Sequence, residues 1–114
     1  MKIVETYTAT IYIGTKDTKR IWKDSLPSDA YNICQDYCNT VGLCVTVTPT
    51  TYIYSYGNEP GFIIGLINYP RFPSSPEKIK EQSLELAEML RYHYRQRRCT
   101  IVFPDETIML GDDD

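Results

Sequence analysis

The chain has 114 residues, a formal net charge of −3 and 24% charged side chains, which suits one ordinary globular domain. The negative charge argues against a dedicated nucleic-acid binder, which would carry a basic field. No run approaches the roughly 18 apolar residues that a membrane helix needs, and the N-terminus has no apolar signal region, so we expect a cytoplasmic protein.

The first predicted strand covers residues 3–13, where two kinds of side chain alternate. The apolar set is Tyr7, Ala9, Ile11 and Ile13, and the opposite set is Thr6, Thr8, Thr10 and Tyr12. Such alternation is typical of a strand with one face on a core. A polar connection over residues 14–24 follows, with basic residues around Trp22. It is either a solvated loop or a cationic flap over an anionic ligand.

A first helix is predicted from about residue 28 to residue 41, with Ser25 or Ser28 as its cap and Gly42 as its stop. Apolar side chains recur there every three or four residues. That spacing indicates an amphipathic helix with one face against a sheet.

The central stretch predicts a β-hairpin. Residues 41–54 alternate between aliphatic and Thr or Tyr side chains, residues 57–61 are predicted to form the turn, and residues 62–67 form an apolar inner strand. The following loop, residues 68–73, presents Asn68, Tyr69, Arg71 and Phe72 between two prolines. It is the first candidate for a site.

A second helix should begin after Ser74 or Ser75, with Pro76 in its first turn and Glu77 able to complete a capping box with Ser74. Four glutamates crowd its start and four arginines gather at its end, an order that complements the helix dipole. We expect a strand at residues 99–103 next, and a short extra strand at residues 108–110 that resumes the pairing.

The element order β-α-β-β-α-β, with a small extra strand, predicts an α+β fold with an antiparallel-rich sheet, two helices on one face and a ferredoxin-like arrangement. We expect a single domain over residues 1–111 and a disordered acidic tail at 112–114. The other sheet face is then uncovered and rich in Thr and Tyr. A half-apolar exposed face predicts a homodimer or a higher oligomer.

The four cysteines, Cys34, Cys38, Cys44 and Cys99, are expected to be reduced residues of the core. Cys34, Cys38 and Cys44 have a C-x3-C-x5-C spacing, which is not a standard zinc pattern. A zinc site, a disulfide or a reactive thiol are the lesser alternatives.

Catalytic motifs are weak. His93 is the sole histidine, Asp105 and Glu106 point to opposite faces of an extended chain, and no phosphate-binding or metal motif occurs. We therefore expect no enzyme activity, no cofactor and no metal.

Residues that could bind a small anionic ligand carrying a base are better represented. Rings stack on bases, guanidinium groups bind phosphate, and amides or carboxylates read base edges. Two groups of residues supply these types: Asn68, Tyr69, Arg71 and Phe72 in the loop, and Arg97, Arg98, Asp105 and Thr107 near the end of the chain. Packing over the second helix is the alternative role of Tyr69 and Phe72.

Residues 32–38, 41–50, 59–61, 67–73 and 102–107 give the chain its similarity to a known family. It resembles the Thoeris anti-defence sponges, small phage proteins that sequester cyclic ADP-ribose isomers without cleaving them. The resemblance implies dimers or hexamers with pockets between protomers. It also implies that some members bind cyclic oligonucleotides at separate sites in the assembly. It implies that Tyr69, Arg71 and Phe72 cradle adenine and phosphate, and that Arg98 with Asp105 closes the pocket.

Two other functions stay open from the sequence. A small nucleotide-metabolising enzyme would need a titrating group such as His93 or Asp105. A protein-interaction inhibitor would use the Thr/Tyr-rich sheet face.

Overall fold

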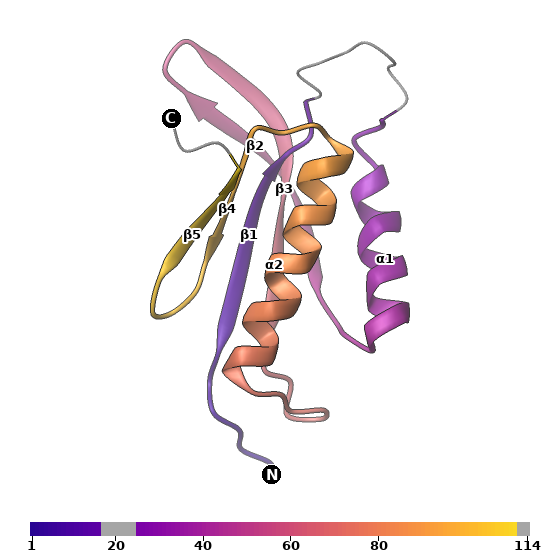
Figure 1. The fold of residues 1–114 in the computed structure, drawn as a ribbon, viewed down its shortest axis with the longest axis vertical. Coiled ribbons are helices and arrows are strands. Elements are labelled where there is room, and N and C mark those ends of the chain that lie inside the picture. The colour runs from indigo at the N-terminus through magenta and orange to yellow at the C-terminus, as the bar shows by residue number, and fades with distance from the viewer. Residues whose placement is uncertain (17–24, 112–114) are drawn as a thin grey trace.

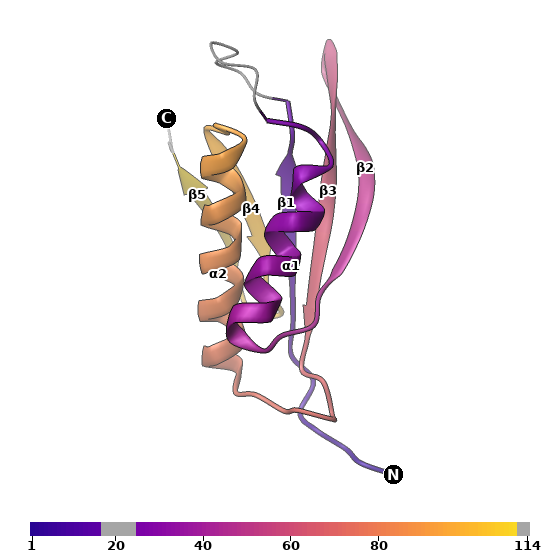
Figure 2. The same cartoon turned by 90° about the vertical axis from the view of Figure 1, so that its right-hand side faces the viewer.

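The computed structural model describes residues 1–16 and 25–111. Along the chain its elements are β1 (Thr8–Gly14), α1 (Asp29–Val41), β2 (Thr46–Tyr54), β3 (Gly57–Ile67), α2 (Pro76–His93), β4 (Arg98–Val102) and β5 (Thr107–Gly111). The five strands form one sheet in the order β2-β3-β1-β4-β5, and all neighbours are antiparallel. Both helices lie on the same side of that sheet (Figures 1 and 2). The predicted α+β class and ferredoxin-like order are confirmed, with β5 added beside β4.

The core lies between the sheet and the helices. The apolar set predicted for the first strand is buried there, and Ile11 and Ile13 are fully covered. From α2, the core receives Ile79, Leu86 and Leu90, which share one helical face. The apolar face of the strand and the apolar face of the helix are removed from water only when the two elements pack together, and this burial stabilises the fold.

The helix ends follow from local chemistry. Gly42 ends α1 with a φ of 72°, a left-handed conformation that costs glycine little, and its N–H donates to the carbonyl of Cys38. At the start of α2 the cap is Ser75, whose hydroxyl accepts the Lys78 N–H at 3.1 Å. The capping box predicted for Ser74 and Glu77 is therefore wrong.

The β2–β3 turn is also displaced from its predicted position. Residues 57–61 belong to β3 and pair with β2 along their whole length. The chain reverses at residues 54–57, where Tyr56 takes a φ of 65°. β3 is thus five residues longer than the predicted strand at its N-terminal end, which lays Glu59 on the sheet.

The C-terminal end of α2 fastens the start of α1. The hydroxyl of the buried Tyr94 donates to the carbonyls of Leu26 and Pro27, both at 3.0 Å. One carboxylate oxygen of Asp29 accepts the Leu26 N–H at 2.8 Å and lies 2.9 Å from Nε2 of His93. His93 therefore has a structural contact at this junction.

The Asp29 contacts predict a specific acid response. The bond from the Leu26 N–H, and then the one from His93, hold the pKa of the Asp29 carboxyl below its usual 3.8. A lowered folded-state pKa adds stability above pH 3.8, and that stability is lost as the pH falls through the folded value. Urea unfolding at pH 7 and pH 3 should show a smaller acid loss for Asp29→Asn than for the wild type. Asp36→Asn removes the same charge from the exposed side of α1, and it should lose as much free energy of unfolding between pH 7 and pH 3 as the wild type. Equal losses in the wild type and both variants would contradict the assignment of this acid response to Asp29.

The cysteines divide by burial. Cys34 and Cys99 are buried and Cys38 is partly buried, so these three agree with the expected reduced core residues, whereas Cys44 is exposed. Burial raises the pKa of the Cys34 and Cys99 thiols to about 12, which keeps them protonated and unreactive. Among the described residues, no His, Cys, Asp and Glu side chains cluster in a way that could hold a metal ion.

Three expectations remain: the absence of a membrane helix, the cationic flap and the disordered acidic tail. No helix in the described ranges is long and apolar enough to cross a membrane. The proposed cationic flap beyond Lys16 and the acidic tail at 112–114 fall outside the described residues.

Candidate functional site

The open face of the sheet, opposite the helices, is the surface predicted to carry Thr and Tyr. The register confirms it: Thr46, Gly65 and Thr10 lie side by side, and so do Thr48, Ile63 and Tyr12. Paired residues in neighbouring strands point to the same face, so the Thr and Tyr sets of β1 and β2 coincide. Tyr12, Ile67, Val102 and Met109 leave 37–44% of their surface exposed on this face.

Three glycines lie in one row across the upper part of this face. Gly61 of β3 pairs with Gly14 of β1, and Gly111 of β5 lies in the same row beyond Arg98 of β4. We call Gly61, Gly14 and Gly111 the glycine row. Because glycine has no side chain, these positions let neighbouring side chains lie flat on the backbone.

Two side chains fill the space that the glycine row leaves. A Cβ built on Gly14 would lie 2.4 Å from Oε2 of Glu59, and one built on Gly61 would lie 2.4 Å from Cε2 of Tyr52. Glu59 and Tyr52 are cross-strand partners, so they lean together over the row. Glycine at 14 and 61 is thus what positions a carboxylate and a phenol on the sheet.

The Tyr52 phenol is held neutral. Its hydroxyl donates to the Phe62 carbonyl at 2.6 Å, and burial raises the pKa of Tyr52 to about 12. It therefore acts as a fixed ring and a hydrogen-bond donor, and it is a poor general base at neutral pH.

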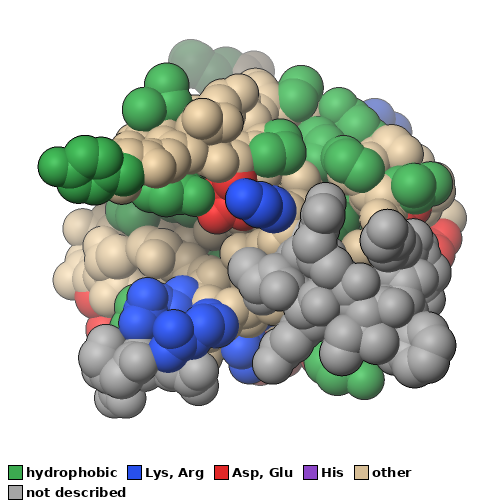
Figure 3. Space-filling view, turned by 90° about the horizontal axis from the view of Figure 1, so that it is seen from above, with side chains coloured by type: hydrophobic (Ala, Val, Ile, Leu, Met, Phe, Trp, Pro, Cys, Tyr) green, Lys and Arg blue, Asp and Glu red, His purple; other side chains and the backbone are tan. Residues whose placement is uncertain are grey.

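Charge is sparse on the open face. By strand alternation, Glu59 is the one carboxylate and Arg98 the one cation that the described strands place there. Lys16 directly follows β1, is exposed, and comes next in register beside Glu59. In the view from above, one group of Lys and Arg side chains lies at the lower left, another basic side chain lies near the middle against acidic atoms, and apolar groups lie mainly along the upper part (Figure 3).

The predicted site residues do not all meet. Asn68, Tyr69, Arg71 and Phe72 lie in the loop after β3, at the opposite end of the sheet from Arg97 and Arg98 (Figure 1). Asp105 and Thr107 are at the β4–β5 turn, four residues of β4 away from Arg98. Within one chain, the pairing of Arg98 with Asp105 across a pocket is not formed.

The loop after β3 is built from internal contacts. The Asn68 side chain donates to the Glu5 carbonyl and accepts the Ser74 N–H, each at 2.8 Å. The rings of Tyr69 and Phe72 stack on one another, with centroids 5.3 Å apart. Asn68 thus uses its amide to shape the loop, while Arg71 and Phe72 stay exposed.

If Asn68 shapes the loop, its replacement should change stability and leave ligand affinity unchanged. Asn68→Ala removes two hydrogen bonds of a buried amide and should cost roughly 2 kcal/mol in the free energy of unfolding, measured by urea titration. Ligand affinity at the glycine row should not change. Asn39→Ala, which removes an exposed amide of α1, should be nearly neutral in both; loss of binding without loss of stability in Asn68→Ala would restore a ligand role.

Asp105 belongs to a closed group of charges. Lys80 of α2 lies 3.5 Å from Oδ2 of Asp105 and also contacts Glu106, while the Tyr7 hydroxyl donates to Oδ1 of Asp105 at 3.2 Å. The bond with Glu106 raises the pKa of Lys80, so the amine stays protonated. These contacts tie the β4–β5 turn to α2 and to the start of β1. A cavity of about 420 Å³ nearby is lined by the N-terminal segment, Ile67, Asn68 and Pro70.

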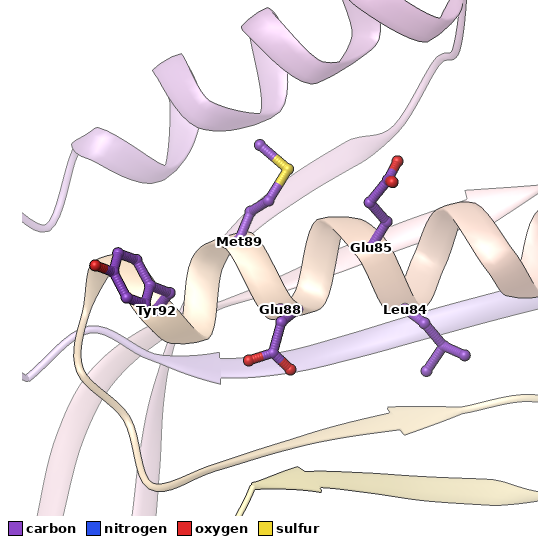
Figure 4. A pocket seen from close by; sticks show the side chains of 5 residues that line it. All are labelled: Leu84, Glu85, Glu88, Met89 and Tyr92. Carbon is purple, nitrogen blue, oxygen red and sulfur yellow. The ribbon is translucent and has the colours of Figure 1, made fainter.

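A larger hollow, of about 620 Å³, lies along α2 and offers no convergent chemistry. Leu84, Glu85, Glu88, Met89 and Tyr92 line it. Figure 4 shows Glu85 and Met89 on the α1 side of the helix and Leu84 and Glu88 on the opposite side. Glu85 already accepts the Tyr37 hydroxyl, and Glu88 binds Arg91.

Sequence reasoning missed Glu59, Tyr52 and the glycine row as site residues. The predicted turn at residues 57–61 included Glu59 and Gly61, and the predicted polar connection included Gly14. Strand alternation extended through residues 57–61 would have placed Glu59 on the same face as Gly61 and Ile63, which is the signal that was available.

Comparison with known proteins shows that solved structures share the fold of this chain. No family model matches the sequence, and no curated protein matches it. A phage SAM lyase in complex with S-methyl-5′-thioadenosine superposes with a TM-score of 0.74 at 12% identity, over 99% of this chain and 95% of that one. A phage SAM lyase in its apo state gives a TM-score of 0.69 at 13% identity, over 95% and 90%.

These structures correct the expectation that the protein is not an enzyme, because the chain shares its fold, nearly from end to end, with a lyase. Both are phage proteins, which is compatible with the phage context implied by the sequence resemblance. They do not show the Thoeris sponge family, and the molecule bound in the first is a nucleoside thioether and not a cyclic ADP-ribose.

Proposed function

We propose that this protein is an enzyme that binds S-adenosylmethionine or a close adenosine sulfonium compound and breaks its carbon–sulfur bond in the cytoplasm of a phage-infected cell. The observation that carries the proposal is the fold shared with a phage SAM lyase over 99% of this chain and 95% of that one. Fold alone does not specify chemistry, so the second support must come from the side chains of this chain.

The Glu59 end of the open face suits such a ligand. The substrate carries a positive sulfonium and a positive ammonium group, and proteins recognise organic cations with carboxylates and with the faces of aromatic rings. Glu59 supplies the carboxylate, and Tyr52 and Tyr12 supply rings; Gly14 and Gly61 make room for Glu59 and Tyr52 to lie against the sheet.

The reaction needs no external reagent. The bond between the sulfonium and the γ-carbon of the methionine part breaks, and its electron pair stays on sulfur as neutral S-methyl-5′-thioadenosine. The carbon fragment completes its valence from within, because its own carboxylate oxygen forms a bond to the γ-carbon as the carbon–sulfur bond breaks. The protein's part is to bind the substrate in a reactive geometry and to exclude water.

Cyclic ADP-ribose isomers, the ligands implied by the sequence resemblance, are the competing substrate class. They share the adenosine part, and the observation that favours them is Arg98 on the open face, since a guanidinium binds phosphate through two parallel hydrogen bonds. The Glu59 carboxylate beside it disfavours a doubly anionic pyrophosphate.

The experiment is to incubate the protein with S-adenosylmethionine, and separately with cyclic ADP-ribose isomers, and to identify the products by liquid chromatography and mass spectrometry. We expect time-dependent S-methyl-5′-thioadenosine from the first and unchanged compound from the second. Conversion of a cyclic ADP-ribose isomer with intact S-adenosylmethionine would move the function to the competing class. No conversion of either would overturn the proposal.

We also propose that the protein works as a homo-oligomer. The support is the exposed apolar side chains of the open face, over which the described residues place no helix. Light scattering coupled to size exclusion should give a multiple of 13.2 kDa, and a mass of one chain at micromolar concentration would contradict it.

A further inference from the structure

Two cysteines of the C-x3-C-x5-C pattern, Cys38 and Cys44, lie at the two ends of one turn. Gly42 ends α1 in a left-handed conformation, and the carbonyl of Cys38 accepts the Gly42 N–H at 2.9 Å and the Leu43 N–H at 3.3 Å. These two bonds form a Schellman motif, which folds the chain back over the last turn of the helix. Cys44 is the next residue of the chain, so it lies on the returning segment.

The Cys38 thiol lies across that turn from α1 to Cys44. Its sulfur accepts the N–H of Val45, and the peptide that carries this N–H joins Val45 to Cys44, so the sulfur lies against the main chain of Cys44. Burial, and then the neighbouring Cys44, raise the pKa of Cys38. Cys38 is partly buried and Cys44 is exposed. One thiol of the pair is therefore open to reagents in solution, and the other lies behind it.

The other two cysteines do not share this arrangement. Cys34 and Cys99 are each only 2% exposed, which closes them to reagents in solution. Cys34 lies one helical turn before Cys38 on the same face of α1, where both side chains project in the same direction and not toward one another. A bond between Cys34 and Cys38 would therefore require the helix to distort.

We infer that Cys38 and Cys44 form a thiol-oxidation site, which reacts with a low-molecular-weight disulfide and forms an internal disulfide across the end of α1. The Cys44 thiolate attacks one sulfur of the reagent, and a mixed disulfide forms as the first thiolate leaves. The Cys38 thiolate then attacks the Cys44 sulfur and displaces the second thiolate. Two electrons pass to the reagent, the protons of the two cysteines go to the leaving thiolates, and the reagent ends as two thiols.

Accessibility decides the order of the two attacks. The reagent reaches the exposed Cys44 first, whereas Cys38 is partly buried. The thiolate is the nucleophile, and the raised pKa of Cys38 keeps less of this thiol in that form at neutral pH. Cys38 therefore reacts second, once the mixed disulfide is attached beside it and the attack takes place within one molecule.

Oxidation changes one contact of the loop after β3. In the reduced protein the Tyr69 phenol makes a hydrogen bond with Cys44, and this bond, followed by burial, raises the pKa of Tyr69. Tyr69 in turn stacks on Phe72. A bond from Cys44 to Cys38 removes the thiol hydrogen and turns the sulfur toward α1, so Tyr69 loses this partner. The cysteine pair lies at the opposite end of β2 from Tyr52, so the inference does not rest on the proposed function.

The test is incubation of the reduced protein with glutathione disulfide, followed by alkylation of the remaining thiols and intact-mass spectrometry. We expect the wild type to lose the mass of two hydrogen atoms and to carry no glutathione. Cys38→Ser should stop at the mixed disulfide and carry one glutathione on Cys44. Cys44→Ser should stay reduced, because its remaining thiols are buried or partly buried.

Cys34→Ala removes the neighbouring buried thiol and leaves the pair, so this matched control should form the disulfide as fast as the wild type. A wild type that stays reduced, or that keeps the glutathione, would overturn the inference, and so would an internal disulfide that survives in Cys44→Ser. Chymotryptic mapping of the oxidised wild type locates the bond even if a variant fails to fold. The urea midpoint should rise on oxidation, because the bond restricts the unfolded chain; a fall would show that the fold distorts to join the sulfurs, and would also overturn the inference.

Discussion

Replacing Glu59 by glutamine is expected to lower kcat/KM for S-adenosylmethionine by about 100-fold, or about 3 kcal/mol, the cost of losing one partner of a close charge pair. Glutamine has nearly the same shape and fits the same space over Gly14, so the fold should be unchanged. The loss should therefore come from the charge. The measurement is the initial rate of S-methyl-5′-thioadenosine formation at several substrate concentrations.

A matched carboxylate on the other side of the molecule controls for net charge. Glu81 is exposed on α2, where it pairs with Lys78. Glu81→Gln should retain wild-type kcat/KM and wild-type stability. A Glu59→Gln variant that turns over substrate as fast as Glu81→Gln would remove Glu59 from the site.

Gly61→Ala should produce a large loss of stability from a single added methyl group. Its Cβ would lie 2.4 Å from the Ile13 carbonyl oxygen of β1 and 2.4 Å from the Tyr52 ring. The carbonyl belongs to the backbone of the central strand and cannot rotate away, so the β3–β1 ladder must shift. We expect a loss of about 3 kcal/mol in the free energy of unfolding, at the upper end of overpacking effects, with the urea midpoint as the measure.

Gly65 gives the comparison for that prediction. It lies in the same strand and on the same face, but its added Cβ would meet only Thr46, with the side-chain oxygen at 2.6 Å. A side chain can change its rotamer, so Gly65→Ala should cost clearly less. Equal losses would show that the close backbone approach at Gly61 is not what requires glycine there.

The sequence was sufficient for the elements whose hydrophobic period is unbroken. The alternation through Ile11 and Ile13 and the 3–4 spacing through Leu86 and Leu90 both survive in the structure, because burying those faces is the main gain on folding. From these, the order of elements and the open Thr/Tyr face followed.

The hairpin turn was misplaced for a physical reason. A Gly-Asn-Glu-Pro-Gly stretch has turn composition, yet Gly57 and Gly61 serve to make room for Tyr54 and Tyr52, and Pro60 joins the sheet through its carbonyl, which accepts the Thr15 N–H. The left-handed turn residue is Tyr56, a type that rarely adopts a positive φ. The backbone pairing of the long β2–β3 ladder therefore outweighed the local turn propensity of residues 57–61.

The site was only partly within reach of the sequence for the same reason. Arg98 was chosen by residue type and lies on the open face. Asn68 was chosen on the same ground, and its amide turned out to be occupied by Glu5 and Ser74. Residue type says what a side chain can bind, whereas only the fold says which side chains are already bound.

Amide chemical shifts during a titration with S-methyl-5′-thioadenosine test the location of the site most directly. Glycine amides occupy a resolved region of the proton–nitrogen spectrum, so Gly14, Gly61 and Gly65 report on the open face from the backbone itself. We predict the largest shifts at Gly14 and Gly61, with little change at Asn68, Lys80 and Asp105. Shifts centred on the loop after β3 or on α2, with Gly14 and Gly61 unmoved, would contradict the account.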